Sequence, residues 1–368
     1  MNNRKPIREI IAIVTITTFG IFLFSYVAFM LFQDKLPSSL LTIWNRWDTA
    51  HYLDIAERGY TNKTIGERHL RIVFFPFYPF LIRHFNLILN DYMVSALVVS
   101  NLAYVVAVFY LYKLTLLDYA EETALRAVFY FSIFPTAYFL HAGYTESLFS
   151  ALTIASFYYG RKERWWLAGL VGMLASATRI TGIILLPALI LEYLSQKDFQ
   201  LKSIKKDIIW LIIIPIGFVS YLIINQITFE NPLKFLEFQK GHWSKTLAFP
   251  WDGISGTWKA ISGRPPTYKI LVGWAEFIFG VLGYVLTLWA FFIRLRPSYI
   301  FFMIATWLTL TSTSYLLSTP RYALSVFPVF IVLSLLGKRE EVNYLITFLS
   351  IMFLALFLTH FSLGRWAF

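Results

Sequence analysis

Residues 10–32 read IIAIVTITTFGIFLFSYVAFMLF, an apolar run without a charged side chain. A helix of this length can cross the hydrocarbon layer of a bilayer, which is about 30 Å thick. The run is too long for the apolar part of a cleaved signal peptide and lacks a convincing small-residue cleavage site. The stretch therefore predicts a spanning helix, and with it an integral membrane protein.

Further apolar runs repeat along the chain, and the composition fits the same class. Of the 368 residues, 58% are hydrophobic, 19% aromatic and 14% charged, which excludes a soluble domain. The pattern predicts an all-α membrane protein with about eleven transmembrane helices in one domain, residues 1–368. The helices are expected near residues 8–32, 92–113, 123–141, 145–160, 165–180, 181–195, 207–228, 269–294, 298–317, 321–337 and 341–360. The lack of an obvious internal repeat counts modestly against the common transporter folds.

The charge and the residue composition limit the cofactors and partners that the chain is expected to bind. The chain has no cysteine, which excludes disulfides and thiolate catalysis, and its six histidines form no tight pair. The histidines therefore give no recognisable zinc site, and no metal is expected. No glycine-rich phosphate loop is present, so a nucleotide cofactor is not expected either. The net charge of +11 suits anionic membrane lipids or a phosphorylated substrate, although membrane insertion also produces basic loops. The basic residues form no stripe, so nucleic acid is not an expected partner.

Short basic loops fall on one side of the predicted helices, and the positive-inside rule makes that side cytoplasmic. The long polar segments 33–91 and 229–268 then lie outside and are expected to form the roof of an active site. Helix ends on the same side carry His141, Tyr144, Glu146, Arg179 and Arg321. The unusual polar residues thus converge on one extracytoplasmic face, as an active site between membrane helices requires.

The first outer segment contains WNRWDTAHYLDIAERGY, residues 44–60. Ionisable groups beside a bilayer core are costly and are therefore candidates for function. A helix from about Trp44 to Arg58 would place Trp44, Asp48, His51 and Ile55 on one face. Its aromatic residues would anchor it along the membrane interface. The alternative is an anchoring helix whose charges are only solvated.

A second motif, FFPFYP at residues 74–79, is too short to span the membrane. Its two prolines break a helix, while its aromatic residues favour the interface. The segment either forms the wall of a lipid-facing cavity or is a surface turn.

Three charged residues interrupt apolar runs near the outer boundary. Glu146 and Arg179 either form a buried structural ion pair or face substrate hydroxyls and phosphate. The guanidinium group of Arg321 has a fork geometry that matches phosphate oxygens, which indicates a binding residue. Alternatively, Arg321 lies at a helix end and extends its charged group to the membrane surface without a function.

The second outer segment carries Gln239, His242 and Trp243, followed by the FPWD stretch at residues 249–252. An amide, an imidazole and indoles form the mixed polar and flat surface that binds sugars. A lone histidine in a loop is more often structural than catalytic.

These motifs, together and in order, resemble the PIG-V family. This is the family of the second mannosyltransferase in glycosylphosphatidylinositol anchor assembly, with its prokaryotic relatives. The similar blocks are W-x-R-W-D-x-x-H-Y-L-x-I-A-x-x-G-Y at 44–60, F-F-P-F-Y-P at 74–79, F-P-T-A-Y-F-L-x-x-x-Y-T-E-S-L at 134–148 and R-W-W-L-A-G-L at 164–170. Looser similarity covers A-T-R-I-T-G at 177–182, F-x-x-F-Q-x-x-H-W at 235–243, F-P-W at 249–251 and R-Y at 321–322.

The resemblance implies an integral membrane glycosyltransferase of the GT-C type, with Asp48 at the position of the catalytic base. The implied donor is a polyprenyl-phosphate sugar, with mannose as the family's sugar, and the acceptor is a lipid or glycan. The chain is compact beside eukaryotic members, which points to a prokaryotic enzyme. The topology predicted from the basic loops places its active site on the extracytoplasmic face of the plasma membrane.

The expected mechanism is a single displacement that inverts the anomeric carbon. Asp48 would deprotonate the acceptor hydroxyl, because a lipid phosphate is already a good leaving group and only one base is needed. Arg179 and Arg321, with His242 or Arg46, would stabilise the departing phosphate. The remaining candidate substrate-binding residues are His51, Tyr144, Glu146, Gln239 and Trp243.

Two other classes stay open from the sequence. A glycolipid transporter or flippase could use a similar cavity, and a non-catalytic membrane subunit could anchor a partner. The transporter would move a glycolipid without transferring sugar, and the subunit would tolerate loss of the Asp48, Arg179 and Arg321 charges.

Overall fold

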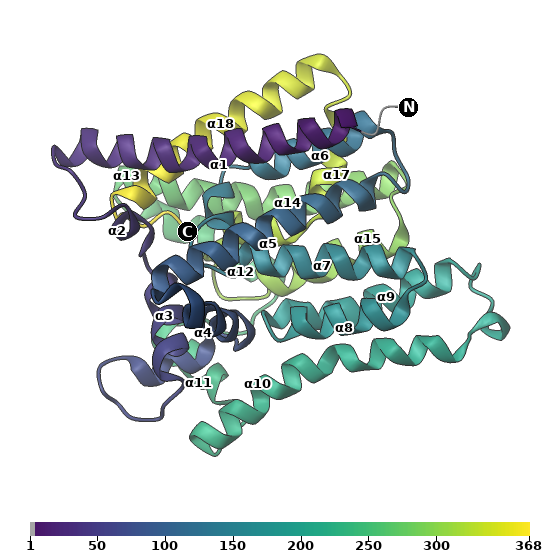
Figure 1. Ribbon diagram of the computed structural model, residues 1–368, viewed down its shortest axis with the longest axis horizontal. Coiled ribbons are helices and arrows are strands. Elements are labelled where there is room, and N and C mark those ends of the chain that lie inside the picture. The colour runs from purple at the N-terminus through teal and green to yellow at the C-terminus, as the bar shows by residue number, and fades with distance from the viewer. Residues whose placement is uncertain (1–3) are drawn as a thin grey trace.

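The computed structural model describes residues 4–368, in which every regular element is helical and no strand is present. Its longer helices lie side by side in a bundle, while short helices gather at one end (Figure 1). In the first half of the chain the α-helices are α1 Arg4–Gln33, α2 Leu40–Trp44, α3 Asp48–Arg58, α4 Phe77–Leu89, α5 Tyr92–Thr115, α6 Glu121–Ser132, α7 Glu146–Arg161, α8 Trp165–Ser176 and α9 Leu185–Ser195. In the second half they are α10 Ile214–Phe229, α11 Lys234–Trp243, α12 Pro250–Ser262, α13 Pro266–Tyr268, α14 Trp274–Phe292, α15 Pro297–Thr311, α16 Thr319–Tyr322, α17 Pro328–Leu336 and α18 Glu340–Ser362.

Shorter helical turns join or extend these elements. The 3₁₀ turns are η1 Arg68–Val73, η2 Ala137–Leu140, η3 Ile180–Ile184, η4 Leu201–Ser203, η5 Lys206–Ile213 and η7 Ala323–Ser325, and η6 Lys269–Gly273 is π-helical.

Within the described residues, five helices are long and apolar enough to cross a membrane. They are Pro6–Gln33, Tyr92–Thr115, Lys206–Phe229, Pro266–Phe292 and Glu340–Ser362. The pair Thr319–Ser325 and Pro328–Leu336 adds a sixth if it is one broken span, bent by 91°. The prediction of an all-α protein with membrane-spanning helices is therefore confirmed at this level.

Each of the eleven segments expected from the sequence contains a helix, but several helices are shorter than expected. In the segment 123–141, helix α6 ends at Ser132, shortly before Pro135. A proline disfavours helical backbone in the residue before it. The segment 321–337 is divided ahead of Pro328, which begins α17. How many of the eleven segments cross the bilayer stays a prediction.

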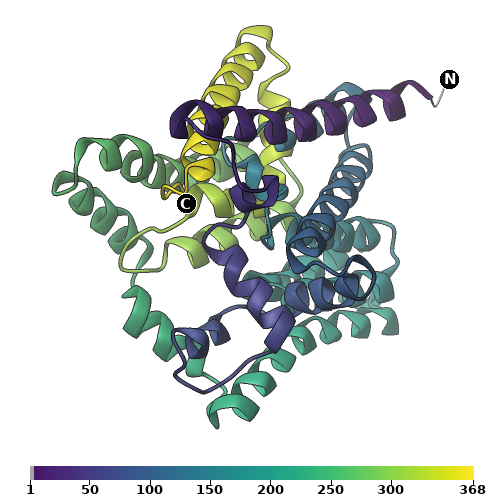
Figure 2. The ribbon, with the colours of Figure 1, turned by 60° about the vertical axis from the view of Figure 1, so that its left-hand side comes forward.

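The two long polar segments, 33–91 and 229–268, fold into short helices at the same end of the bundle. Helices α3, α4 and α11 lie together there, and turning this end forward brings α3 in front of the bundle (Figures 1 and 2). The contact between α11 and η1 joins the two segments directly.

The helix expected from Trp44 to Arg58 is interrupted. Helix α2 ends at Trp44 and α3 begins at Asp48, because Trp47 has φ 48° and ψ −116°, far from helical values. Trp44 and Tyr52 were expected at the interface but are buried in protein, with 2% and 7% of their surfaces exposed. Whether α3 lies along the membrane stays a prediction.

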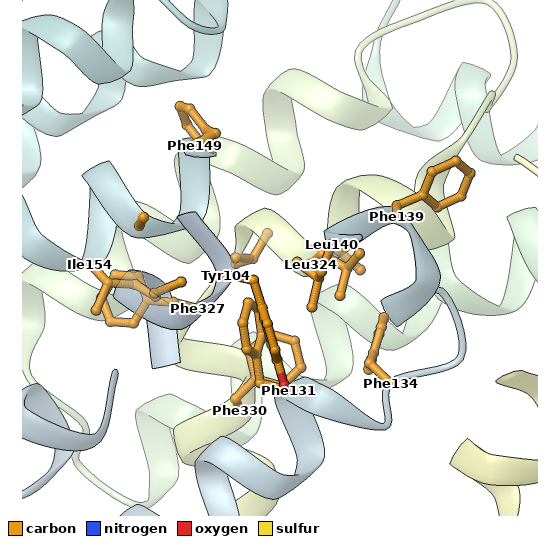
Figure 3. Packing of buried hydrophobic residues seen from close by; sticks show 14 of the residues in the cluster. Tyr104, Phe131, Phe134, Phe139, Leu140, Phe149, Ile154, Leu324, Phe327 and Phe330 are labelled. Atoms are coloured by element: carbon orange, nitrogen blue, oxygen red, sulfur yellow. The ribbon is translucent and has the colours of Figure 1, made fainter. Parts of the chain in front are cut away.

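An aromatic core lies between the bundle helices and supports this end. Phe330 of α17 contacts Phe131 of α6 and Phe134, with ring centroids 5.0 and 5.3 Å apart (Figure 3). Phe139 of η2 packs against Tyr144 at 4.8 Å. The core therefore extends to the turn that precedes α7, from which the polar residues described next project.

Candidate active site

Asp48 is the first residue of α3 and follows the non-helical Trp47. A positive φ is unfavourable for a tryptophan, and such strain is often found at functional sites. Gly143 lets the first turn of α3 come close to the turn before α7, since a Cβ at Gly143 would lie 2.6 Å from Thr49 Cγ2. This close approach places the Asp48 carboxylate beside residues of α7.

Four charged residues from different parts of the chain form one network. Arg321 Nη1 donates to Asp48 Oδ2 at 2.9 Å, and Arg321 Nε lies 3.2 Å from Glu146 Oε1. Arg179 Nη1 donates to the same Glu146 oxygen at 2.8 Å. Positive and negative groups therefore alternate in the order Asp48, Arg321, Glu146, Arg179.

Burial increases from Asp48 toward the centre of this network. The exposed fractions of the side chains are 26% for Asp48, 8% for Arg321, 15% for Arg179 and 1% for Glu146. Buried charges are retained when they are paired, and each guanidinium here has a carboxylate partner. Asp48 is the member of the network most accessible to a substrate.

Aromatic rings cover the two guanidinium groups. The Arg321 guanidinium lies 5.3 Å from the Tyr144 ring centroid and 4.9 Å from that of Tyr322. Arg179 lies 4.6 Å from the Tyr322 ring centroid. These cation–π contacts hold the arginines in place while their remaining N–H groups can meet an anion.

Two cavities meet at Asp48. The larger has a volume of about 220 Å³ and the smaller about 170 Å³. Both are lined by Asp48, Phe74, Trp243, Leu317 and Trp366. The FFPFYP segment contributes Phe74 and Phe75 to the larger one, and Phe75 stacks on Tyr221 at 4.0 Å. The position of the FFPFYP segment therefore agrees with the predicted cavity wall and not with a surface turn.

The larger cavity has an excess of positive charge. Its charged lining residues are the cations Arg179, Lys245 and Arg321 and the carboxylates Asp48 and Glu146. Three cations against two carboxylates leave one positive charge, which equals the charge needed to balance a phosphodiester. Both arginines offer the planar fork that suits phosphate oxygens.

The smaller cavity is lined by His51, Glu67, Arg71 and His242 beside the indoles of Trp47 and Trp243. Burial is the largest influence on His51 and lowers the pKa of its imidazole, although the nearby Asp48 carboxylate opposes this. Its buried Nδ1 has no hydrogen-bond partner among the described residues. A neutral imidazole here can exchange hydrogen bonds with a hydroxyl group.

The other predicted residues occupy different places around these cavities. Tyr144 and Gln239 line the larger cavity, and His242 lines the smaller one. Arg46 lines neither, since its Nη2 donates to the Ser362 carbonyl at 3.1 Å. Its main-chain carbonyl accepts a hydrogen bond from the Tyr144 hydroxyl at 3.1 Å. Arg46 thus supports the site from outside the cavity linings.

Several cavity residues were not singled out in the sequence as binding residues, among them Lys245, Tyr322 and Trp366. Lys245 follows α11 in a polar segment, where a lysine is unremarkable, and Tyr322 follows Arg321 directly. Trp366 comes after α18 and packs on Trp47 with ring centroids 5.1 Å apart. Of these three, Tyr322 alone had a sequence signal, as the second letter of the R-Y block.

Known proteins resemble the chain in sequence. The family described as dolichyl-phosphate-mannose-protein mannosyltransferase matches residues 75–236, which include Glu146 and Arg179. GPI alpha-1,6-mannosyltransferase 2 of Rattus norvegicus is 32% identical over 162 residues, and that of Homo sapiens is 28% identical over 164. These matches cover 41% and 42% of this chain and 32% of each relative, so the chain spans about a third of their length in the alignment.

A solved structure resembles the fold. ArnT from Cupriavidus metallidurans, bound to undecaprenyl phosphate, has a TM-score of 0.55 and 13% sequence identity. The match covers 87% of this chain and 59% of that one. Together with the apolar helices, the likeness identifies the chain as an integral membrane protein with this fold.

Proposed function

We propose that this chain, part of which is similar to membrane mannosyltransferases, is an inverting glycosyltransferase of the GT-C class. Its donor is a polyprenyl-phosphate sugar, with mannose as the sugar, and its acceptor is a lipid or glycan. The support for the donor comes from the names of the relatives and from the undecaprenyl phosphate bound to ArnT.

The observation that carries the proposal is the position of Asp48 in the common wall of two cavities. The larger cavity, with Arg179, Lys245 and Arg321, suits the phosphate of the donor. The smaller cavity, with its indoles and imidazoles, suits the acceptor. A carboxylate between them can take a proton from an acceptor hydroxyl that faces the donor sugar.

The transfer is a single displacement. The acceptor oxygen forms a bond to the anomeric carbon as its proton passes to the Asp48 carboxylate, and the bond from that carbon to the phosphate oxygen breaks. The electron pair of the broken bond leaves with the lipid phosphate. Attack opposite the leaving group inverts the configuration at carbon.

The arginines act on the leaving group. Arg321 is held at 2.9 Å from Asp48, and it and Arg179 share Glu146, so both guanidiniums are oriented before the substrate enters. Preorganised cations in a partly dehydrated cavity stabilise the charge that develops on the phosphate. Lys245 adds a third positive charge in the same lining.

The proposal includes the placement of the enzyme in the membrane. We place the single domain in a prokaryotic plasma membrane with about eleven spans, α3 along the interface and the active site outside. The segments 33–91 and 229–268 then form its roof. The shared position of α3, α4 and α11 at one end of the bundle supports this arrangement.

The test incubates the purified protein with radiolabelled polyprenyl-phosphate mannose and a crude bacterial lipid extract, and follows which lipid gains label. Replacing Asp48 by Asn should lower transfer by about a hundred- to ten-thousand-fold while donor binding persists. Asp91→Asn is the matched control, because Asp91 caps α5 by accepting from the Val94 N–H and asparagine caps as well.

The same experiment distinguishes the other classes. A transporter would show no sugar transfer even without a substitution, and a non-catalytic subunit would behave alike with and without the Asp48→Asn substitution. Either result, obtained with folded protein that binds the donor, would remove the proposal.

A further inference from the structure

Glu276 is a buried carboxylate that lines neither cavity. It lies near the start of α14, with 2% of its surface exposed. Its Oε1 accepts the Ser318 N–H at 2.5 Å, and its Oε2 accepts the Thr319 N–H at 2.8 Å. Both oxygens of one side chain are therefore used to hold two consecutive main-chain amides.

Those amides lie at the beginning of α16, which carries Arg321. Ser318 has φ 63°, a left-handed conformation that is unfavourable for serine and needs support from its surroundings. Pro320, the next residue after Thr319, has no N–H, so the Ser318 and Thr319 amides are the donors available just ahead of Arg321. Glu276 takes both of them.

A second contact fixes the same turn from the opposite direction. Thr136 Oγ1 donates to the Pro320 carbonyl at 2.8 Å in the protein interior. One turn further along α14, Gly280 lets the Leu316 side chain approach, since a Cβ there would lie 2.6 Å from Leu316 Cδ1. The backbone that precedes Arg321 is thus held by its amides and by its carbonyl.

We propose that Glu276 is a positioning residue, which sets the place of the Arg321 guanidinium between Asp48 and Glu146 by holding the turn at residues 318–319. This inference rests on the proposed function, because it assigns Glu276 a part in the same transfer reaction. Glu276 itself contacts no substrate, and it acts through Arg321.

The substitution Glu276→Gln tests this with little change in volume. The carbonyl oxygen of glutamine can accept a hydrogen bond from one of the two main-chain N–H groups. Its NH₂ group takes the place of the second carboxylate oxygen and, being a donor, cannot accept from the other N–H. The turn then loses one hydrogen bond, and Arg321 shifts relative to Asp48. We expect kcat to fall about tenfold while the KM for polyprenyl-phosphate mannose stays within about twofold.

The decisive measurement is a double-mutant cycle with Arg321→Lys. That single change should lower transfer about a hundredfold, because lysine cannot join Asp48 and Glu146 as the guanidinium does. If Glu276 acts through Arg321, Glu276→Gln adds little in the Arg321→Lys protein, and the double variant stays near a hundredfold loss. A general weakening of the fold would instead multiply the two effects to about a thousandfold, which would overturn the inference.

Two further variants complete the design. Glu122→Gln is the control, because Glu122 is an exposed glutamate in the first turn of α6. This variant should transfer sugar at the rate of the unaltered protein. Thr136→Val removes the other contact to the turn and should show the same lack of additivity with Arg321→Lys, so it decides the question if Glu276→Gln does not fold. Absence of transfer by the unaltered protein would remove the proposed function, whereas transfer with fully multiplicative losses would remove only the role of Glu276.

Discussion

Glu146→Gln is the most informative perturbation of the charged network. Glu146 Oε1 lies 2.8 Å from Arg179 Nη1 and 3.2 Å from Arg321 Nε, so one oxygen serves two guanidiniums. Removing one partner of a buried ion pair costs about 3–5 kcal/mol, because it leaves charge buried without compensation. The arginines are only 15% and 8% exposed, so water can recover little of that loss.

This cost converts into a measurable change in melting temperature. An unfolding entropy of about 2.1 cal/mol/K per residue over the 368 residues gives about 0.8 kcal/mol per degree. The variant should therefore melt about 4 to 6 °C lower. The 12 tryptophans allow the transition to be followed by intrinsic fluorescence in detergent.

Ligand binding gives the same substitution a second readout. Without the Glu146 charge, the lining of the larger cavity gains one unit of positive charge. Polyprenyl phosphate should then bind the variant more tightly and raise its melting temperature more than that of the unaltered protein. A purely structural ion pair would not produce this difference.

The matched control is Glu163→Gln, which removes an exposed carboxylate that pairs with Lys197 at 3.0 Å. Glu163 is 57% exposed, and such surface pairs contribute at most about 1 kcal/mol, so the melting temperature should change by about 1 °C or less. Equal shifts for Glu146→Gln and Glu163→Gln would refute the reasoning from burial. An unchanged response to polyprenyl phosphate would refute the assignment of the larger cavity to phosphate.

Three other predictions follow from the geometry. Gly143→Ala should slow transfer, because its Cβ would lie 2.6 Å from Thr49 Cγ2 and push α3 away, and adding Thr49→Ala should restore most of the rate. Lys245→Ala should raise the donor KM about tenfold with kcat little changed, as loss of binding common to ground and transition states does; a fall in kcat alone would contradict this. The lowered pKa of His51 means that the unfolded chain binds a proton at a higher pH than the folded one, so stability should fall as pH drops below about 6.5. Melting curves of the unaltered protein and His51→Gln across that range check this, because the variant should lose less stability in acid.

The charged members of the network could be predicted individually because each stands out locally. Glu146, Arg179 and Arg321 interrupt apolar runs, and Asp48 lies in an unusually polar segment beside such a run. The Glu146–Arg179 pair was one of two alternatives that the sequence offered. The contacts of Arg321 with Asp48 and Glu146 could not be predicted, since they are made only by the packing of α3, α7 and α16.

Other parts of the site had weaker signals. Glu276 is a lone carboxylate in the apolar run 269–294, so its burial could have been suspected, but its contact with the turn at 318–319 depends on tertiary structure. Lys245 and Trp366 lie outside the long apolar runs, where charge and aromaticity carry little information.

The helix pattern was predictable in type and less so in length. Hydrophobicity locates α1, α5, α14 and α18 well, because these helices are continuous. Hydrophobicity alone predicts one helix where the structure has α16 and α17, because the average apolarity of residues 321–337 contains no information on the bend of 91° between them. The position of Asp48 at the beginning of α3 depends on the backbone conformation of Trp47, which the hydrophobic periodicity of the sequence does not predict.

In the proposed mechanism, the Asp48 carboxylate that lines both cavities acts while donor and acceptor are bound side by side. That mechanism requires a ternary complex of protein, donor and acceptor, in which no sugar becomes attached to a side chain between two half-reactions. Double-reciprocal plots of initial rate at several fixed donor concentrations should consequently intersect, whereas parallel lines would indicate a covalent relay.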